Sequence, residues 1–304
     1  MINLHHYAII FDIKKQAVKN LTIFIVLLAL IAGAFSCGFF TNDVAYAAVL
    51  PDAVSNQWFD GEDYNNFNDT LQAINKIKDG LSTAEKADFK NNPVLVAVID
   101  TGINASHELF DGVLCDEGLW YNAITHKNGR DYIDDTCNNG TLVGHGTHVA
   151  GIVAQEIKKY GLEDYIKILP VKASNDGSFD ASYVVEAINY VKDLATQDKT
   201  IVINMSLTKM IKSSDTSSWG KNKAIDAMIQ SAVREGVIVC AAAGNNGYNS
   251  SSTGKSLGSP ACLENVIGVM NYGEGLIPAP KSNYGAAYDI AAPGQKIISA
   301  AKLV

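Results

Sequence analysis

Two histidines lie close together in the segment TLVGHGTHVAGIVA, residues 141–154. His145 and His148 can bind a metal, pack in the core or transfer a proton. A zinc protease helix would have a glutamate directly after the first histidine, and this chain has Gly146 there. The other nearby ligand types match no familiar metal spacing: Asp134, Asp135 and Cys137. The sequence therefore argues against a metal site.

The residues around His145 favour proton transfer. His145 stands between Gly144 and Gly146, just before an expected helix, which is an accessible position. His148 falls one turn into that helix, whose small residues suit tight packing against backbone, so we expect His148 to be buried and hydrogen-bonded. A histidine base needs a carboxylate that fixes its tautomer and stabilises its charged form. Asp100, at the end of an apolar run, is the candidate.

Apolar runs alternate with helical patterns along the chain. The runs cover residues 94–100, 166–172, 201–207, 237–245, 265–270 and 288–294. Helical spacing of apolar residues covers 181–195 and 223–236, and Gly236 is a natural helix stop. This alternation predicts an α/β fold with a mostly parallel, doubly wound sheet covered on both faces. No linker-like composition divides residues 93–304, so we expect one domain there.

Polar residues stand at the ends of three of these runs. Asp100 ends the first, Ser206 lies at the end of the third, and Asn245 ends the fourth. Each of these residue types is common in turns, which is the simplest explanation for any one of them. Because ligands of open α/β sheets bind beyond the carboxyl ends of the strands, the three together predict a site at one sheet edge.

Four motifs in order resemble the subtilisin-like serine proteases, the subtilases. They are VAVIDTG (96–102), GHGTHVAG (144–151), VINMSL (202–207) and AAAGNNG (241–247). The resemblance covers about residues 93–301, and the first two motifs together are highly specific. It implies a subtilisin-like fold and a serine endopeptidase that hydrolyses peptide bonds with an Asp-His-Ser triad.

The resemblance also implies residue roles. Asp100 would orient His145, which would act first as general base and then as general acid. Asn245 would donate its side-chain amide to the oxyanion of the tetrahedral intermediate. Calcium is common in the family, but no ligands for it can be matched in this chain.

The same resemblance places a peptide substrate along the third motif. Ser206 and Leu207 would lie beside the substrate main chain as a strand-like edge. The family usually continues with glycine, whereas this chain continues with Thr208 and Lys209. We therefore expect a specificity pocket of altered shape.

The nucleophile is the largest departure from the family. A Gly-Thr-Ser motif would follow shortly after Gly294, and the sequence to Val304 contains none. Other serines stand in unsuitable settings: Ser217, Ser218 and Ser299. We expect the sheet to be incomplete at the C-terminus, with the serine beyond Val304, so that the chain as given is inactive. The helix opened by that serine would cover one face of the sheet, so we also expect this chain alone to fold poorly. The alternative is a membrane-tethered, noncatalytic pseudoprotease that binds peptides.

The N-terminus has the pattern of an export signal. Residues 21–40 are uncharged and largely apolar, and lysines precede them. Small residues in AYAA allow cleavage after Ala47, although the same stretch could remain as a membrane anchor. We expect residues 1–47 to be the signal or anchor, 48–92 an extension wrapping the catalytic domain, and 93–304 a partial catalytic domain. The protein would be secreted, or anchored and facing outside.

Charge and cysteine content limit the partners further. The chain is 47% hydrophobic, and its net charge of −8 gives no basic footprint for nucleic acid. We expect peptide or protein substrates, and membrane contact only through an uncleaved N-terminal segment. Cys115 and Cys137 flank a polar loop and can form a disulfide, whereas Cys240 in an apolar run is expected to be a buried free thiol.

Overall fold

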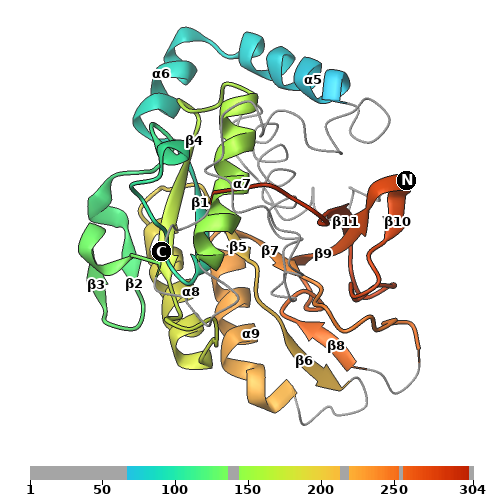
Figure 1. The fold of residues 1–304 in the computed structure, drawn as a ribbon. Coiled ribbons are helices and arrows are strands. Elements are labelled where there is room, and N and C mark those ends of the chain that lie inside the picture. The colour runs from blue at the N-terminus through green and yellow to red at the C-terminus, as the bar shows by residue number, and fades with distance from the viewer. Residues whose placement is uncertain (1–66, 136–143, 213–218, 253–255, 301–304) are drawn as a thin grey trace.

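A computed structural model describes residues 67–135, 144–212, 219–252 and 256–300. In these ranges the chain forms a nine-stranded sheet in the order β10-β9-β7-β5-β1-β4-β2-β3, with β11 also paired to β9 (Figure 1). The five strands at its centre are parallel: β1 (Val94–Asp100), β4 (Ile166–Lys172), β5 (Ile201–Met205), β7 (Ile238–Ala242) and β9 (Val266–Gly273).

Shorter strands complete the sheet at its edges. On one side, β2 (Tyr121–Asn122) is parallel to β4 and antiparallel to β3 (Lys127–Asn128). On the other side, β11 (Ile290–Pro293) is parallel to β9, and β10 (Ile277–Pro278) is antiparallel to it. A separate antiparallel pair, β6 (Lys209–Lys212) and β8 (Ser256–Ser259), lies next to the carboxyl ends of the central strands.

Three long helices cover the two faces of the sheet. Helix α7 (His145–Lys159) lies on one face, and α8 (Ala181–Ala195) and α9 (Trp219–Arg234) lie on the other (Figure 1). The N-terminal helices α5 (Phe67–Gly80) and α6 (Thr83–Asn91) lie at the end of α7. Single 3-10 turns occur in the loops: η2 (Glu108–Phe110), η3 (Glu117–Leu119), η4 (Arg130–Tyr132) and η5 (Glu274–Leu276).

Local sequence accounts for the helix limits. Asp180 caps α8 by accepting a hydrogen bond from the Ser182 amide at 2.8 Å. Helix α9 ends at Arg234, and Gly236 follows with a φ of +86°, the left-handed conformation that glycine adopts without steric cost. The Gly236 amide donates to Val233 O and the Val237 amide donates to Ala232 O, which satisfies the last carbonyls of the helix. The predicted helix stop at Gly236 is confirmed.

Successive side chains of the central strands point to opposite faces of the sheet, which divides the core into two layers. Val94, Val96 and Val98 of β1 pack in the same cluster as the buried side of α7. Leu95, Ala97 and Ile99 point to the opposite face and pack in the cluster that includes α8 and α9. Both faces of β1 are therefore buried, which explains its continuous apolar sequence. The predicted α/β fold with a mostly parallel, doubly wound sheet is confirmed.

The ends of several elements differ from the predictions. Strands β5 and β7, which correspond to the third and fourth predicted runs, end at Met205 and Ala242, before the polar residues that were expected to end them. Ser206 and Asn245 therefore lie in the loops that leave the sheet. His145 is the first residue of α7, whereas the sequence had suggested that it precedes the helix.

Part of the predicted N-terminal extension is described. Ile74 of α5 and Phe89 of α6 are buried in the cluster shared with α7, and Lys78 Nζ donates to Gly161 O at 3.1 Å. The remainder of residues 48–92, and the predicted signal or anchor, lie outside the described residues, so the domain limits stay predictions. In the described ranges, no helix has the length and apolar character needed to span a bilayer.

The described cysteines are thiols. Cys240 is fully buried and free, as predicted, and burial raises its pKa well above the usual value. Cys115 is also a free thiol, and its predicted partner Cys137 lies outside the described residues. Because Cys115 carries a free thiol, the predicted disulfide between Cys115 and Cys137 is not formed in the structure.

Candidate active site

The predicted site residues gather at the carboxyl edge of the sheet. Asp100 is the last residue of β1, and its register partner on β4 is Lys172. On the other side of β1, Ser206 directly follows β5, and Asn245 follows β7 after a short turn. Because β1, β5 and β7 are parallel neighbours, their loops leave the sheet at one edge.

Asp100 and His145 are joined by a direct hydrogen bond. His145 Nδ1 lies 2.6 Å from Asp100 Oδ1, and both side chains are buried. The Thr101 amide donates to the same carboxylate oxygen at 2.8 Å, which fixes the orientation of the carboxylate. Within the described residues no hydrogen-bond partner reaches Asp100 Oδ2. The bond occupies Nδ1, so Nε2 is the imidazole nitrogen suited to proton transfer with a substrate.

The surroundings of His145 act on its pKa in opposite directions. Burial lowers the pKa because it disfavours the charged imidazolium. The negative charge of Asp100, the hydrogen bond that the imidazole donates to its carboxylate and the charge of Asp135 outweigh burial, so the pKa of His145 is raised. The site therefore stabilises the protonated imidazole, as a general base requires after it has accepted a proton.

Glycine allows the start of α7 to approach β1. A Cβ on Gly146 would collide with the Gly102 carbonyl oxygen and lie 3.1 Å from Asp100 Cβ. The Gly146 amide instead donates to Thr101 Oγ1 at 2.9 Å. Gly144, the residue before the helix, has a φ of +78° and provides no side-chain cap. The two glycines beside His145 are thus required for different reasons: Gly144 by its positive φ, and Gly146 by the lack of space for a side chain.

Asp135 caps α7 from outside the helix, a role that the sequence did not reveal. Its Oδ2 accepts hydrogen bonds from the Thr147 amide at 2.9 Å and from Thr147 Oγ1 at 2.8 Å. The Asn104 amide donates to the same hydroxyl oxygen at 2.9 Å. The sequence had suggested Asp135 only as a possible metal ligand. Across the described ranges, no three His, Cys, Asp or Glu side chains are grouped as metal ligands would be.

Lys172 links the loops on either side of the Asp100–His145 pair. Its side chain is buried, and Nζ donates to Thr101 O at 2.6 Å and to Asp134 O at 2.9 Å. Lys172 therefore connects the end of β1 to the segment that supplies the helix cap. The sequence showed only a lysine at the end of an apolar strand, which gives no indication of this role.

His148 is buried in the first turns of α7, as predicted. Burial lowers its pKa to about 4, the charge of His145 lowers it as well, and a hydrogen bond with the Ile297 main chain opposes them. Ser299 Oγ donates to His148 O at 2.7 Å. The Ser299 hydroxyl thus bonds to the helix backbone rather than to the His145 imidazole, which agrees with the prediction that Ser299 does not replace the nucleophile.

Ser206 and Leu207 are almost fully buried. Their exposed fractions are 0% and 8%. Ser206 Oγ accepts a hydrogen bond from Asn204 Nδ2 at 3.1 Å. A peptide at this edge would therefore meet the main chain of these two residues rather than their side chains.

Thr208 fills space where the family usually has glycine. Its Oγ1 donates to Ala242 O at 2.6 Å, which ties the loop after β5 to the end of β7. A Cβ added to Gly244 would lie 2.9 Å from Thr208 Cγ2, and one added to Gly258 would lie 3.0 Å from it. The threonine methyl group therefore lies between two glycine backbones, next to the Asn245 loop. Lys209, the second departure from the family, begins β6.

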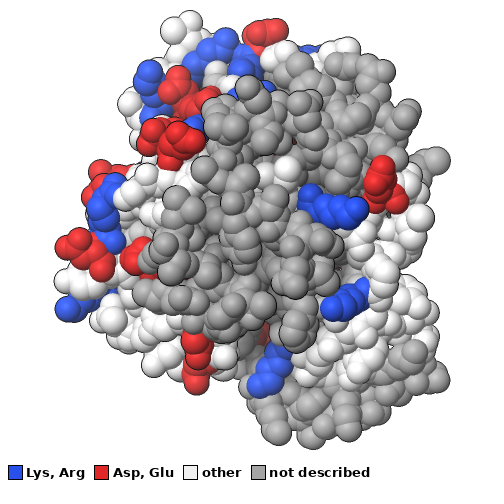
Figure 2. All heavy atoms as spheres, viewed as in Figure 1, with Lys and Arg blue, Asp and Glu red and all other residues white. Residues whose placement is uncertain are grey.

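Charged side chains of both signs are mixed on the described part of the face that Figure 2 shows. Figure 2 shows acidic and basic residues interspersed over α5, α6 and the β2–β3 hairpin. Arg130 and Glu117 form an exposed ion pair there, with 2.7 Å between Nη2 and Oε1. The expectation that nucleic acid is not a partner stays a prediction.

Comparisons with known proteins agree with the motifs. The model of the subtilase family, Peptidase S8, matches residues 91–303. Alkaline protease 1 of Emericella nidulans is 35% identical over 206 residues, covering 67% of this chain and 43% of that protein. The thermophilic serine proteinase of Bacillus sp. (strain AK1) is 34% identical over 214 residues, covering 67% and 44%. The chain thus spans less than half the length of these relatives.

Solved structures show the same fold. A cold-adapted subtilisin-like serine proteinase matches with a TM-score of 0.51 and 28% identity, covering 70% of this chain and 67% of the other. Sphericase matches with a TM-score of 0.51 and 24% identity, covering 69% of each chain, which supports the fold alone. The family match, the relatives and the bonded Asp100–His145 pair agree, and the chain belongs to the subtilase family.

Proposed function

We propose that this protein is a secreted subtilisin-like serine endopeptidase that hydrolyses peptide bonds. The observation that supports the proposal most directly is the 2.6 Å hydrogen bond between Asp100 and His145, buried at the carboxyl edge of the sheet. A carboxylate bonded to Nδ1 leaves Nε2 to exchange protons with a serine hydroxyl and a leaving group.

The proposed residue roles rest on this hydrogen bond for Asp100 and His145 and on the family resemblance for Asn245. His145 Nε2 accepts the proton of the nucleophilic hydroxyl as its oxygen forms a bond to the peptide carbonyl carbon. Asp100 stabilises the imidazolium, and Asn245 donates its amide to the oxyanion. When the C–N bond breaks, the imidazolium returns the proton to the leaving amine. Water then repeats the sequence on the acyl-enzyme, which releases the second product and restores the serine.

Substrates in this proposal are extended peptides. The main chain of Ser206 and Leu207 forms the edge beside which the peptide lies, because the side chains of both residues are buried. The Thr208 methyl group beside Gly244 narrows the space next to Asn245. The protein would therefore prefer a small side chain immediately before the cleaved bond.

The nucleophile remains a prediction from the sequence. The sequence to Val304 contains no Gly-Thr-Ser, and the proposal assigns that motif to residues beyond Val304. Sequencing the coding DNA past codon 304 tests this assignment directly. An open frame that encodes Gly-Thr-Ser supports it, and a reproducible stop codon at that point contradicts it.

Labelling with a fluorophosphonate tests the catalytic proposal on the protein isolated from its source. We expect one serine to be labelled, and we expect His145→Ala to abolish the labelling because the hydroxyl is then no longer activated. His126→Ala, at an exposed histidine of the β2–β3 turn, is the matched control and should label normally. A polypeptide ending at Val304 should not label at all.

The second candidate is a noncatalytic peptide-binding protein tethered through residues 21–40. Measurable peptide affinity without turnover, in a protein that retains residues 21–40, would support this candidate over the protease. Mass spectrometry of the N-terminus decides between cleavage after Ala47 and a retained anchor.

Calcium dependence, which the family resemblance suggests, is tested by the loss of thermal stability in a chelator.

A further inference from the structure

We propose that Asn283 is a positioning residue that holds the Asn245 loop in the conformation needed to bind an oxyanion. The inference rests on the proposed function, and it adds a residue that lies outside all four family-like motifs. Asn283 is in the segment between β10 and β11, and its side chain is fully buried.

The Asn283 side chain binds the loop on both sides of Asn245. Its Nδ2 donates to Ala243 O at 2.8 Å, on the N-terminal side of Asn245. Its Oδ1 accepts from the Asn246 amide at 3.1 Å and from the Tyr248 amide at 3.0 Å, just after it. One amide side chain thus satisfies a carbonyl and two N–H groups of the loop, which requires both a donor and an acceptor.

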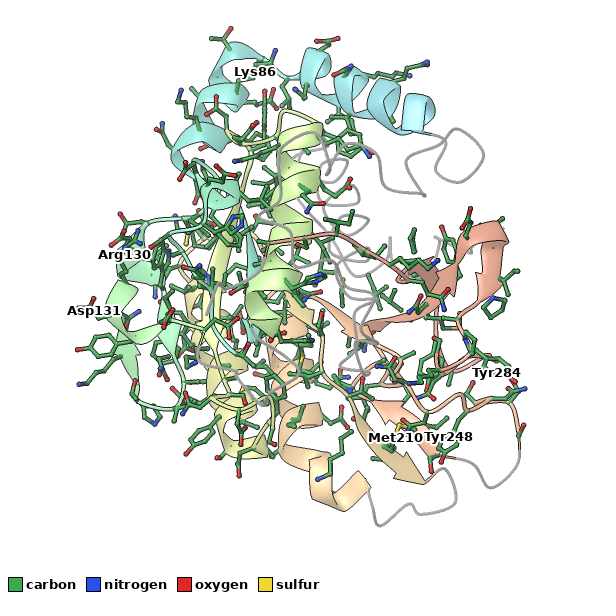
Figure 3. All side chains as sticks on the ribbon, in the orientation of Figure 1. Lys86, Arg130, Asp131, Met210, Tyr248 and Tyr284 are labelled. Carbon is green, nitrogen blue, oxygen red and sulfur yellow. The ribbon has the colours of Figure 1, made fainter. Side chains whose placement is uncertain are left out.

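Main-chain hydrogen bonds add to those of the Asn283 side chain, and we call the two sets together the clamp. The Asn283 amide donates to Gly244 O at 2.8 Å, and the Gly247 amide donates to Lys281 O at 2.8 Å. The Tyr284 amide donates to Tyr248 O at 2.9 Å. Residues 243–248 are therefore held against residues 281–284 along their whole length. Met210, Tyr248 and Tyr284 lie at the same corner of the molecule (Figure 3).

The backbone at Gly244 makes this contact possible. Gly244 has a φ of +99°, and an added Cβ would lie 2.7 Å from Asn283 Nδ2. The loop therefore passes directly over the Asn283 amide. An oxyanion donor is effective only when it is oriented before the charge develops, because reorientation during the reaction reduces the stabilisation. The clamp provides that orientation for Asn245, whose own side chain remains partly exposed.

A double-mutant cycle in the active protein tests the inference. We expect Asn283→Ala to lower kcat by about 10-fold to 100-fold, which is less than the loss of about 10²–10³-fold typical of removing the oxyanion donor itself, with a smaller effect on KM. In an Asn245→Ala background the same change should lower kcat less than twofold, because the residue that it positions is already absent. Equal losses in both backgrounds would overturn the inference and indicate a purely structural role.

Two further variants separate positioning from general damage. Asn271→Ala is the matched control, because Asn271 Nδ2 also bonds a main-chain oxygen, Gly294 O at 3.0 Å, without a hydrogen bond to the Asn245 loop. We expect it to lower thermal stability and leave kcat within about twofold. If Asn283→Ala does not fold, Asn283→Asp retains the acceptor for Asn246 and Tyr248, and it should give a smaller version of the same background-dependent loss.

Amide hydrogen exchange reports on the clamp without any turnover. Asn283→Ala should speed exchange at Asn246 and Tyr248 by at least tenfold while the β7 amides stay protected. Unchanged exchange at these two amides would overturn the inference even in an active protein. Lack of turnover in the unchanged protein would instead overturn the proposed function and the catalytic part of this inference, with the clamp still measured by exchange.

Discussion

The two halves of the site are held in different ways. The proton-transfer half, which we define as Asp100, Thr101, His145 and Gly146, is fixed by short bonds between neighbouring buried groups. The oxyanion half, defined as Thr208, residues 242–248 and Asn283, is a loop held mainly through its main chain by side chains from elsewhere. The first half thus lies within the motifs at residues 96–102 and 144–151. The second half depends on Thr208 and Asn283, which lie outside all four motifs.

The largest expected effect is on the proton-transfer half. Asp100→Asn should lower kcat about 10⁴-fold, because the imidazole loses the partner that fixes its tautomer and stabilises its charge. Asp100 raises the pKa of His145, so removing the charge lowers that pKa. The acid limb of the kcat/KM profile should therefore move to lower pH. Asp111→Asn, at an exposed carboxylate, is the control, and an acid limb that stays in place in Asp100→Asn would contradict the assignment.

The oxyanion half should show a smaller loss. Asn245→Ala should lower kcat by about 10²–10³-fold with little change in KM, because the amide acts mainly in the transition state. The acid limb should keep its position, because Asn245 is neutral at every relevant pH. Steady-state kinetics across pH distinguish this pattern from that of Asp100→Asn. A shift of the limb in Asn245→Ala would mean that the two halves are not independent.

Thr208 should affect specificity more than rate. Thr208→Gly removes the methyl group between Gly244 and Gly258 and enlarges the space beside Asn245. We expect the kcat/KM ratio for peptides with phenylalanine rather than alanine before the cleaved bond to rise by about 10-fold to 200-fold. Thr196→Ala, at the exposed C-cap of α8, is the control. An unchanged ratio in Thr208→Gly would show that the threonine does not limit the pocket.

The smallest effect on activity is expected at His148, which affects stability. Its pKa is about 4 in the folded protein, below the ordinary 6.5, so the unfolded chain binds more protons between these values. Stability should therefore fall as pH decreases from about 6.5 to 4, by up to about 3 kcal/mol. His148→Gln should flatten this dependence in urea unfolding. The raised pKa of His145 removes stability only as pH rises above about 6.5, outside this window. A flat profile between about pH 4 and 6.5 in the unchanged protein would therefore contradict the His148 assignment.

Prediction from sequence was most accurate where local pattern and packing agree. The strands β1 and β4 match the predicted runs because both faces of these strands are buried, so that nearly every residue before the strand end is apolar, with Lys167 of β4 as the exception. The strands before Ser206 and Asn245 are shorter than predicted, because apolar residues continue into loops that are themselves buried. Burial makes a loop look like a strand in the sequence.

Asp135, Lys172 and Asn283 show why part of the site could not be predicted. Each is a polar residue in a segment with no motif, and each acts through main-chain groups distant in sequence. A single sequence records the residue type but not the carbonyl or amide that it reaches. These contacts exist only once the segments are folded together.

The sequence by itself determined the family, the α/β fold and the pairing of Asp100 with His145. The periodicity of apolar residues and a few short motifs are local properties, so they can be read directly from the sequence. Only the tertiary structure decided that Thr208 lies between two glycines, that Asp135 caps α7 and that Asn283 clamps the Asn245 loop. Those features depend on distances between segments far apart in the chain, which packing of the whole sheet and its loops sets.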